Sequence, residues 1–190
     1  MKAGAYGSYE SGLRELIHLL KYDGIRPAAN VLGRMLAEAI AALQPLFSVG
    51  RMVMVPVPLH ARKRRQRGFN QTELVARAAL KLMTANRFDL RPALERTRET
   101  QSQIGLSRHQ RRENLRGAFA VTMPEAIRGR EVLLVDDVFT TGTTASECAR
   151  VLRRAGATKV YVATVARTLK LDAQGARVEP EAAMTMAAAS

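Results

Sequence analysis

The most informative segment of the chain is Val132-Leu133-Leu134-Val135-Asp136-Asp137-Val138-Phe139-Thr140-Thr141-Gly142-Thr143-Thr144. Its first four residues are apolar and predict a buried strand, because strands covered on both faces carry unbroken apolar runs. Two adjacent carboxylates follow at the carboxyl end of that strand, where open α/β sheets bind ligands. Residues 136–143 are predicted to form a loop, and residues 144–155 a helix that ends at Gly156.

The loop has the composition of a phosphate site. Backbone N–H groups at the start of a helix, together with the helix dipole, favour a bound phosphate. Gly142 allows close approach of the backbone and a positive φ angle. The hydroxyl groups that can donate to the phosphate belong to Thr140, Thr141, Thr143 and Thr144. Asp136 and Asp137 lie too close to that phosphate to bind it, and they suit sugar hydroxyls or, indirectly, a divalent cation. The predicted ligand is therefore a ribose 5-phosphate.

The pattern on the carboxyl side of this segment predicts an α/β fold. Residues 159–165 are rich in β-branched side chains and form the next predicted strand. Strand, loop, helix and strand then make one βαβ unit, so we expect parallel strands joined by a right-handed crossover.

The first half of the chain carries further predicted elements. Apolar residues at helical spacing predict two helices, over residues 13–20 and 31–40, and residues 52–57 have the composition of a buried strand. A basic loop follows. Asn70 is then predicted to cap a helix that runs to about Ala85, and residues 88–95 are predicted to be extended.

Length and composition are those of a globular protein. The 190 residues are 47% hydrophobic and 25% charged, and they can bury a core as one domain, with or without a small appendage. Cys148 is the only cysteine, which excludes an internal disulfide framework and a multi-cysteine zinc site. No apolar run approaches the roughly 18 residues that span a membrane. Residues 1–10 lack a signal pattern, so we expect a cytoplasmic protein.

The chain is strongly basic, with 30 Lys or Arg against 17 Asp or Glu and a formal net charge of +13. Residues 60–116 hold fifteen of the basic residues and five of the acidic ones. Such clusters attract the phosphates of small molecules or of a nucleic-acid backbone, and a solvated face that keeps the protein soluble is the alternative. Residues 97–116 lack a hydrophobic stripe and are predicted to be a mobile loop, with or without one helical turn.

Residues 132–144 resemble the phosphoribosyl pyrophosphate (PRPP) signature of type I phosphoribosyltransferases. Other segments resemble the ComF family, which is associated with natural competence: Val55-Pro56-Val57-Pro58-Leu59, Arg67-Gly68-Phe69-Asn70-Gln71, Leu20-Lys21-Tyr22 and Arg112-x-Asn114-x-x-Gly117-Ala118-Phe119. The resemblance covers about residues 7–168. It implies a twisted parallel sheet flanked by helices, with a small hood over the site.

This resemblance also implies a domain organisation. Residues 1–171 would form the phosphoribosyltransferase-like domain, in which residues 1–50 are the helical part of the hood and residues 51–171 the core. Residues 172–190 turn rich in alanine without a pattern, and we expect them to be a disordered tail.

Carried onto this sequence, the resemblance assigns roles residue by residue. Asp136 and Asp137 would be the catalytic pair that holds the ribose 2- and 3-hydroxyls, and residues 140–144 would hold the 5-phosphate. The loop after Pro58 would lie near the pyrophosphate, and its arginines are Arg62, Arg64 and Arg65. Residues 97–116 match the flexible loop that closes over such sites, with Arg108, Arg111 and Arg112 in this lid.

Magnesium is expected as a companion of PRPP, and no direct metal ligation by the protein is predicted. Many ComF proteins begin with a four-cysteine zinc-binding segment that this sequence lacks, so zinc is not expected. Either the chain is a short-form member, or its start omits that segment. Cys148 is expected to be a small buried residue rather than a nucleophile.

The reaction that the resemblance implies is displacement of pyrophosphate from the ribose C1 carbon by an acceptor that the sequence does not identify. Magnesium and the arginine loops would stabilise the leaving charge. Two alternatives stay open: a sensor that binds PRPP without turnover, and a competence protein whose basic segment binds single-stranded DNA electrostatically. His109, in the candidate lid, is the one of the three histidines His18, His60 and His109 that we would test as a base, against the alternative of a solvated loop residue.

Overall fold

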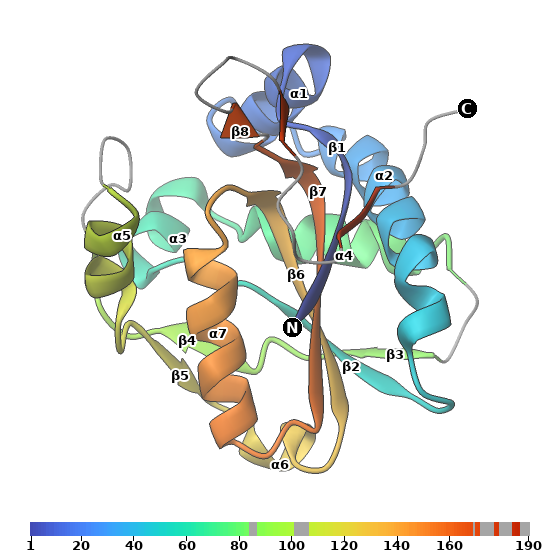
Figure 1. The fold of residues 1–190 in the computed structure, drawn as a ribbon. Coiled ribbons are helices and arrows are strands. Elements are labelled where there is room, and N and C mark those ends of the chain that lie inside the picture. The colour runs from blue at the N-terminus through green and yellow to red at the C-terminus, as the bar shows by residue number, and fades with distance from the viewer. Residues whose placement is uncertain (84–86, 101–106, 169, 172–176, 179–183, 187–190) are drawn as a thin grey trace.

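The computed structural model describes residues 1–83, 87–100, 107–168, 170–171, 177–178 and 184–186. Its centre is a six-stranded parallel sheet in the order β10-β1-β7-β6-β2-β3 (Figure 1). The strands are β1 (Lys2–Ser8), β2 (Met52–Pro56), β3 (Phe88–Leu90), β6 (Glu131–Phe139), β7 (Lys159–Arg167) and β10 (Met184–Met186). The predicted α/β fold with a parallel sheet flanked by helices is therefore confirmed.

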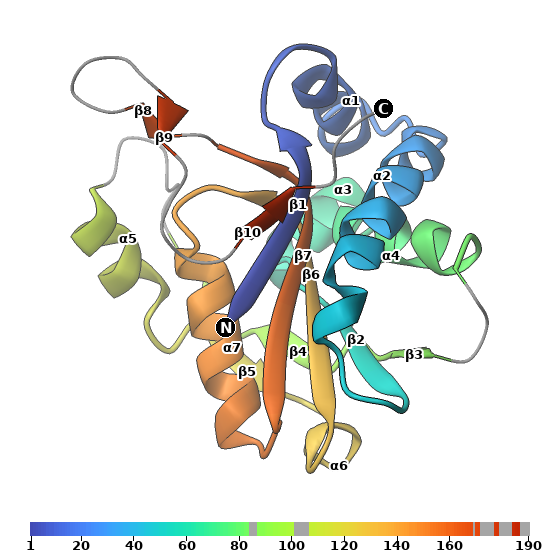
Figure 2. The ribbon, with the colours of Figure 1, turned by 45° about the vertical axis from the view of Figure 1, so that its right-hand side comes forward.

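Helices cover both faces of this sheet (Figure 2). One face carries α1 (Ser11–Lys21), α2 (Ala28–Leu43) and α4 (Gln71–Leu80), and the other carries α7 (Thr143–Arg154) with α5 (Arg108–Leu115) beside it. The shorter elements are the 3-10 turn η1 (Gln44–Leu46), α3 (Ala61–Arg67), α6 (Pro124–Ile127), and two antiparallel pairs, β4 (Leu94–Arg96) with β5 (Phe119–Val121) and β8 (Lys170–Leu171) with β9 (Arg177–Val178).

Alternation along β6 divides the core into two apolar clusters. Leu133 and Val135 pack with α2 and α4, whereas Val132 and Leu134 pack with α7. All four side chains are fully buried, which explains why the strand has no polar position before Asp136. The helices contribute apolar residues at the matching helical spacing, as in Leu32, Leu36, Ile40 and Leu43 of α2.

The strongly periodic segments are the ones that the sequence predicted well. The strands predicted over residues 52–57, 132–135 and 159–165 correspond to β2, β6 and β7, and the three helices predicted in their company correspond to α2, α4 and α7. The helix predicted over residues 13–20 is α1. Asn70 caps α4 through a hydrogen bond from Thr72 N–H to Asn70 Oδ1 of 3.1 Å, and α4 ends at Leu80, earlier than predicted.

The loop predicted over residues 136–143 is wrong in its first half. Strand β6 continues through both aspartates to Phe139, because its backbone stays paired with β7: Asp136 lies opposite Thr164, and Phe139 lies opposite Arg167. The ladder of backbone hydrogen bonds outweighs the low strand propensity of aspartate. Both carboxyl groups are therefore fixed by a strand rather than carried by a loop.

The two basic segments predicted as loops contain helices instead. Residues 61–67 form α3, in which Arg, Lys and Gln are good helix formers, and Gly68 ends it with a φ of 78°. Helix α5 begins with a capping box, in which Ser107 and Gln110 exchange hydrogen bonds, and its Leu115 is fully buried. Residues 101–106 of the predicted mobile loop lie outside the described residues.

The two ends of the chain contribute strands that were not predicted. β1 pairs with β7 inside the main sheet, so residues 1–50 supply a core strand as well as the helices expected for a hood. Residues 172–190 lie largely outside the described part. Within them, β9 is described, and β10 pairs with β1. The division into hood, core and disordered tail stays a prediction.

Helices α2 and α4 approach each other closely at Gly33. A Cβ atom on Gly33 would lie 2.5 Å from Ala78 Cβ and 2.9 Å from Ala79 N. We expect Gly33→Ala to lower the free energy of unfolding, because overpacking costs roughly 1–3 kcal/mol and outweighs the gain in helix propensity of about 1 kcal/mol. Urea unfolding measures the change.

The matched control is Gly12→Ala on α1, where nothing lies within 4 Å of the added Cβ. This variant should be neutral or stabilised by up to about 1 kcal/mol. Equal free energies of unfolding for the two variants would contradict the close packing of α2 on α4.

Candidate functional site

The candidate site lies where the carboxyl ends of β2 and β6 meet. β2 pairs with β6 along residues 53–56 and 132–135. After β2 the chain passes to α4 on one face of the sheet, and after β6 it passes to α7 on the other (Figure 2). Ligands of open α/β sheets bind where the crossovers leave in opposite directions. The topology thus singles out the end of β6, which carries the acidic pair.

The two aspartates point to opposite faces of β6, because successive residues of a strand alternate. Asp137 is 6% exposed and lies on the side of α1 and α4. Asp136 is half-buried and lies on the side of α7, where its charge acts on Cys148 and Arg96. The two carboxyl groups still interact, and Asp137 N–H donates to Asp136 Oδ1 at 2.9 Å.

Asp137 is held by donors from three elements. Lys21 Nζ at the end of α1 lies 2.6 Å from Asp137 Oδ2, and Gln71 Nε2 of α4 donates to the same oxygen at 3.1 Å. Val138 N–H donates to the other oxygen at 2.8 Å. Arg67 of α3 in turn donates to Gln71 Oε1. The network joins α1, α3, α4 and β6 around one carboxylate.

The two carboxyl groups have opposite pKa shifts. Burial raises the pKa of Asp136 well above its usual range, and the charge of Asp137 adds to that rise. Burial also acts to raise the pKa of Asp137, but the ammonium of Lys21 and the hydrogen bonds to Asp137 outweigh burial and lower it. Burial acts to lower the pKa of Lys21, but the charge of Asp137 and the hydrogen bond to it, together with the charges of Asp136 and Tyr9, outweigh burial and raise the pKa. Of the two carboxyl groups, Asp137 is therefore the one whose negative charge the site stabilises.

The threonine-rich segment turns from β6 into α7 as predicted. Gly142 is the residue before α7 and has a φ of 73°. Thr141 Oγ1 and Thr143 Oγ1 lie 2.8 Å apart. Both threonines line a cavity of about 240 Å³ between α5 and α7, together with Arg112, Ser146, Glu147 and Arg150. Thr140 and Thr144 lie on the same turn.

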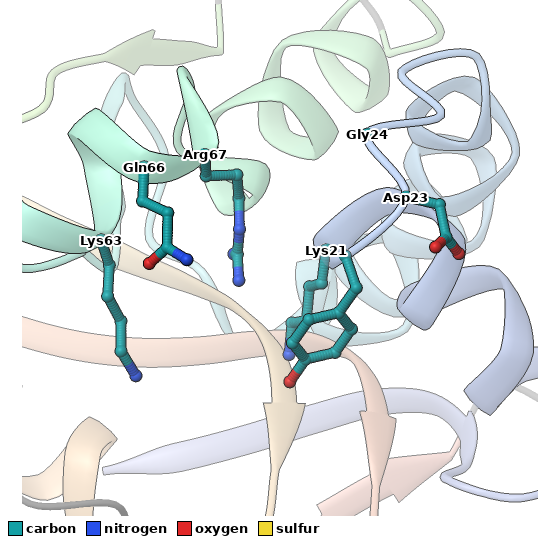
Figure 3. A pocket seen from close by; sticks show the side chains of 7 residues that line it. Lys21, Asp23, Gly24, Lys63, Gln66 and Arg67 are labelled. Carbon is teal, nitrogen blue, oxygen red and sulfur yellow. The ribbon is translucent and has the colours of Figure 1, made fainter.

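A larger cavity of about 370 Å³ lies between α1 and α3. Its lining residues are Lys21, Tyr22, Asp23, Gly24, Lys63, Gln66 and Arg67. Figure 3 shows Lys63, Gln66 and Arg67 extending from one side of α3 toward the space that Lys21 also faces, while the carboxylate of Asp23 points away from it. Three cations therefore face one cavity, and Lys21 connects that cavity to Asp137.

The arginines predicted for the pyrophosphate do not line this cavity. Arg62, Arg64 and Arg65 are exposed on α3, and Arg62 NH1 lies 3.4 Å from Glu99 Oε1. In a loop their side chains could turn together, but the helix spaces residues by about 100° and brings Lys63, Gln66 and Arg67 to one face. Sequence reasoning missed this face because it treated the segment as a loop.

One end of the predicted lid is packed against α7. Gly117 N–H donates to Glu147 Oε1 of α7 at 2.8 Å, and Leu115 is buried, so the carboxyl end of α5 is anchored on α7. Arg112 reaches the cavity beside the threonine loop, and Arg111 has partners of its own. The side chain of Arg108 lies outside the described residues. The closing motion stays a prediction.

The remaining predicted residues have simple environments. Cys148 is fully buried, as predicted, and burial raises the pKa of its thiol. His60 caps α3, His18 lies against the Tyr22 ring, and His109 is exposed on α5. No group of three or more metal-ligating side chains occurs among the residues described. None of the helices in the described part of the chain is long and apolar enough to cross a membrane.

A protein family and several known proteins are similar to this chain. A family model described as "Phosphoribosyl transferase domain" matches residues 72–185. The chain is 37% identical over 164 residues to the DNA utilization protein YhgH of Escherichia coli (strain K12), covering 85% of this chain and 70% of that protein. It is 31% identical over 163 residues to competence protein F of Haemophilus influenzae, with the same coverage. A hypoxanthine phosphoribosyltransferase from Trypanosoma cruzi is similar over 84% of this chain and 71% of that chain, with 15% identity and a TM-score of 0.44.

The turn before α7 requires glycine for two reasons. Gly142 has a positive φ, and a Cβ atom there would lie 2.5 Å from the tip of the Phe139 ring. We expect Gly142→Ala to be destabilised both by the left-handed backbone, which costs about 1–2 kcal/mol, and by the contact with Phe139. Denaturant unfolding measures the total.

Gly68→Ala is the matched control, because Gly68 has a φ of 78° with nothing within 4 Å of an added Cβ. Gly68→Ala should show only the backbone cost. If both variants lose the same free energy of unfolding, the packing of Phe139 against the turn does not matter.

Proposed function

The chain belongs to the phosphoribosyl transferase domain family and to its ComF/YhgH group, and on that premise we propose that its site binds PRPP. The observation that carries the proposal is the joining of three features at one end of β6. These are an acidic pair fixed by the strand, a glycine- and threonine-containing turn at the start of α7, and a cavity with three cations between α1 and α3. A ligand with a sugar diol and phosphates at both ends matches this arrangement.

Each part of PRPP has a partner in this proposal. The 5-phosphate binds the turn of residues 140–144, where backbone N–H groups and hydroxyls converge at the start of a helix. The ribose hydroxyls bind the acidic pair. The pyrophosphate takes the cavity lined by Lys63 and Arg67, which replace Arg62, Arg64 and Arg65 in this role because they share the face of α3 turned toward Lys21.

The proposed reaction is transfer of the phosphoribosyl group. A nucleophilic atom of the acceptor forms a bond to ribose C1, the bond from C1 to the pyrophosphate oxygen breaks, and that oxygen keeps the electron pair. The ring gains positive charge and the leaving group gains negative charge, so cations at the pyrophosphate are the main stabilising groups. No covalent intermediate with the protein is needed, which agrees with the inert environment of Cys148.

The residues at the site do not fit a magnesium ion held by the protein. Asp137 already accepts hydrogen bonds from Lys21, Gln71 and Val138, and the described part of the chain offers no third metal-ligating side chain near the pair. Magnesium prefers several oxygen ligands and often binds through substrate phosphates. Its place in this proposal is on PRPP, and no step above depends on it.

A second candidate function is binding of single-stranded DNA. The names of the relatives, DNA utilization protein and competence protein, suggest a link of this chain to DNA. The observation in favour is the run of exposed cations Arg62, Lys63, Arg64 and Arg65 on α3, of which only Lys63 lines the cavity. Exposed cations of this kind suit a phosphate backbone. A protein that senses PRPP without turnover could use the proposed PRPP site, and it could also bind DNA.

Calorimetric titration of PRPP with magnesium tests the proposed site. The wild type should bind, and the double variant Asp136→Asn, Asp137→Asn should not, because each amide removes the negative charge and replaces one acceptor oxygen for the ribose hydroxyls with an NH2 donor. Thermal unfolding of the double variant should remain cooperative. Binding retained by a folded double variant would refute the role of the pair.

Release of pyrophosphate on adding candidate acceptors then separates transfer from sensing. Binding without release, for every acceptor class that carries a nucleophilic nitrogen, would favour the sensor. No binding by the wild type would leave DNA as the leading explanation.

For DNA, the affinity for a short single strand should fall steeply with salt and depend little on sequence. The slope of log affinity against log salt scales as about −0.7 per phosphate contact. The variant with Arg62, Arg64 and Arg65 changed to Gln should therefore reduce the slope by roughly 2 if all three contact phosphates. Salt-insensitive binding, or no binding at low salt, would exclude this function.

A further inference from the structure

Lys21 is placed where no motif of the phosphate or ribose site accounts for it. It is the last residue of α1, far from β6 in the sequence, and its side chain is only 18% exposed. Its ammonium reaches across to Asp137 Oδ2 at 2.6 Å. A buried lysine is costly unless it is paired, so this contact is a specific feature of the fold.

The geometry makes the two carboxyl groups unequal. Asp137 is turned toward α1 and α4, and both of its oxygens accept hydrogen bonds. Asp136 is turned toward α7, the helix that begins at the threonine turn, and one of its oxygens accepts from Asp137 N–H. Asp136 is also the more exposed of the two. One carboxyl group is thus locked in place, and the other is left to face a ligand.

We propose that Lys21 is a positioning residue for the acidic pair: its ammonium fixes a negative charge on Asp137 and leaves Asp136 as the carboxyl group presented to the ligand. A ribose diol would then meet Asp136, while Asp137 keeps its contacts with Lys21, Gln71 and Val138. This inference rests on the proposed function for its ligand, but the charge distribution itself is a property of the free protein.

The pKa directions agree with this assignment. The pKa of Asp137 is lowered although Asp137 is buried, and the pKa of Asp136 is raised. Gln71 cannot produce this difference alone, because a neutral amide stabilises a carboxylate less than an ammonium does. Arg67 contributes at longer range, since Gln71 lies between its guanidinium and Asp137.

The alternative is that Lys21 only attaches α1 to the sheet. Both roles predict some loss of stability when Lys21 is removed, so stability does not distinguish them. The location of the negative charge does. The charged and titratable groups around Asp137 are Lys21 from α1, Arg67 from α3 and Asp136 on β6, with Tyr9 and Tyr22 acting on the two cations.

The experiment is a titration of the side-chain carboxyl carbons by NMR, in the full chain without ligand. In the wild type, Asp137 should titrate below the usual aspartate range and Asp136 above it. In Lys21→Met, the midpoint of Asp137 should rise above its usual range, because burial and the neighbouring carboxyl group remain without the cation. Lys21→Arg keeps the cation and should leave Asp137 low.

An unchanged midpoint of Asp137 in Lys21→Met would overturn the proposal. If Lys21→Met does not fold, the titrations of the wild type and of Lys21→Arg still test the proposal. Equal titration midpoints for Asp136 and Asp137 in both proteins would contradict a negative charge fixed on Asp137. None of these outcomes depends on PRPP, so they separate this inference from the proposed function.

The affinity for PRPP supplies the second readout. The affinity of the wild type and of Lys21→Arg should stay flat across the pH range in which Asp137 of Lys21→Met titrates by NMR. Across the same range, the affinity of Lys21→Met should fall with decreasing pH, by at most tenfold per pH unit, since one proton is linked to binding. Lys63→Met is the matched control, because Lys63 lines the same cavity without contacting Asp137. It should weaken binding by the same factor at each pH. The same flat profile in Lys21→Met would contradict the proposal.

Discussion

The structure depends on the way in which β6 carries two aspartates into its last pairs with β7. Because pairing continues to Phe139, the side chains alternate, and the two carboxyl groups are sent to opposite faces of the sheet. Asp137 is then buried, and a buried charge left without its partner costs about 3–5 kcal/mol. Lys21 and Gln71 meet that requirement. The ends of α1, α3 and α4 are therefore tied to one carboxylate.

The same arrangement determines where the basic side chains of α3 lie. Gln71 begins α4 and uses its amide to join Asp137 to Arg67, so the end of α3 is held beside the acidic pair. Once that end is fixed, helical spacing decides which cations turn inward: Lys63 does, and Arg62 and Arg65 stay in solvent. The cations of α3 thus form two groups, one that faces the cavity and one that is exposed on the surface.

Sequence patterns were sufficient for the elements whose apolar residues repeat regularly, and for the order of acidic pair, threonine turn and helix. They failed where a neighbouring strand or a helix cap determined the secondary structure. The apolar signal of β6 ends at Val135, although the strand runs to Phe139 because β7 continues beside it. The arginines of α3 form a helix between the caps His60 and Gly68. Lys21 had no local signal for its role, since its partner is more than a hundred residues away.

A site that neutralises its own buried charge is already organised before a ligand arrives. The pair Lys21 and Asp137 does not have to separate for a diol to reach Asp136, so binding needs little rearrangement of the strand end. Under the proposed function, this organisation would serve the binding of PRPP equally well whether or not transfer follows. What would distinguish an enzyme from a sensor must therefore lie in the residues that bind the acceptor and not in the acidic pair.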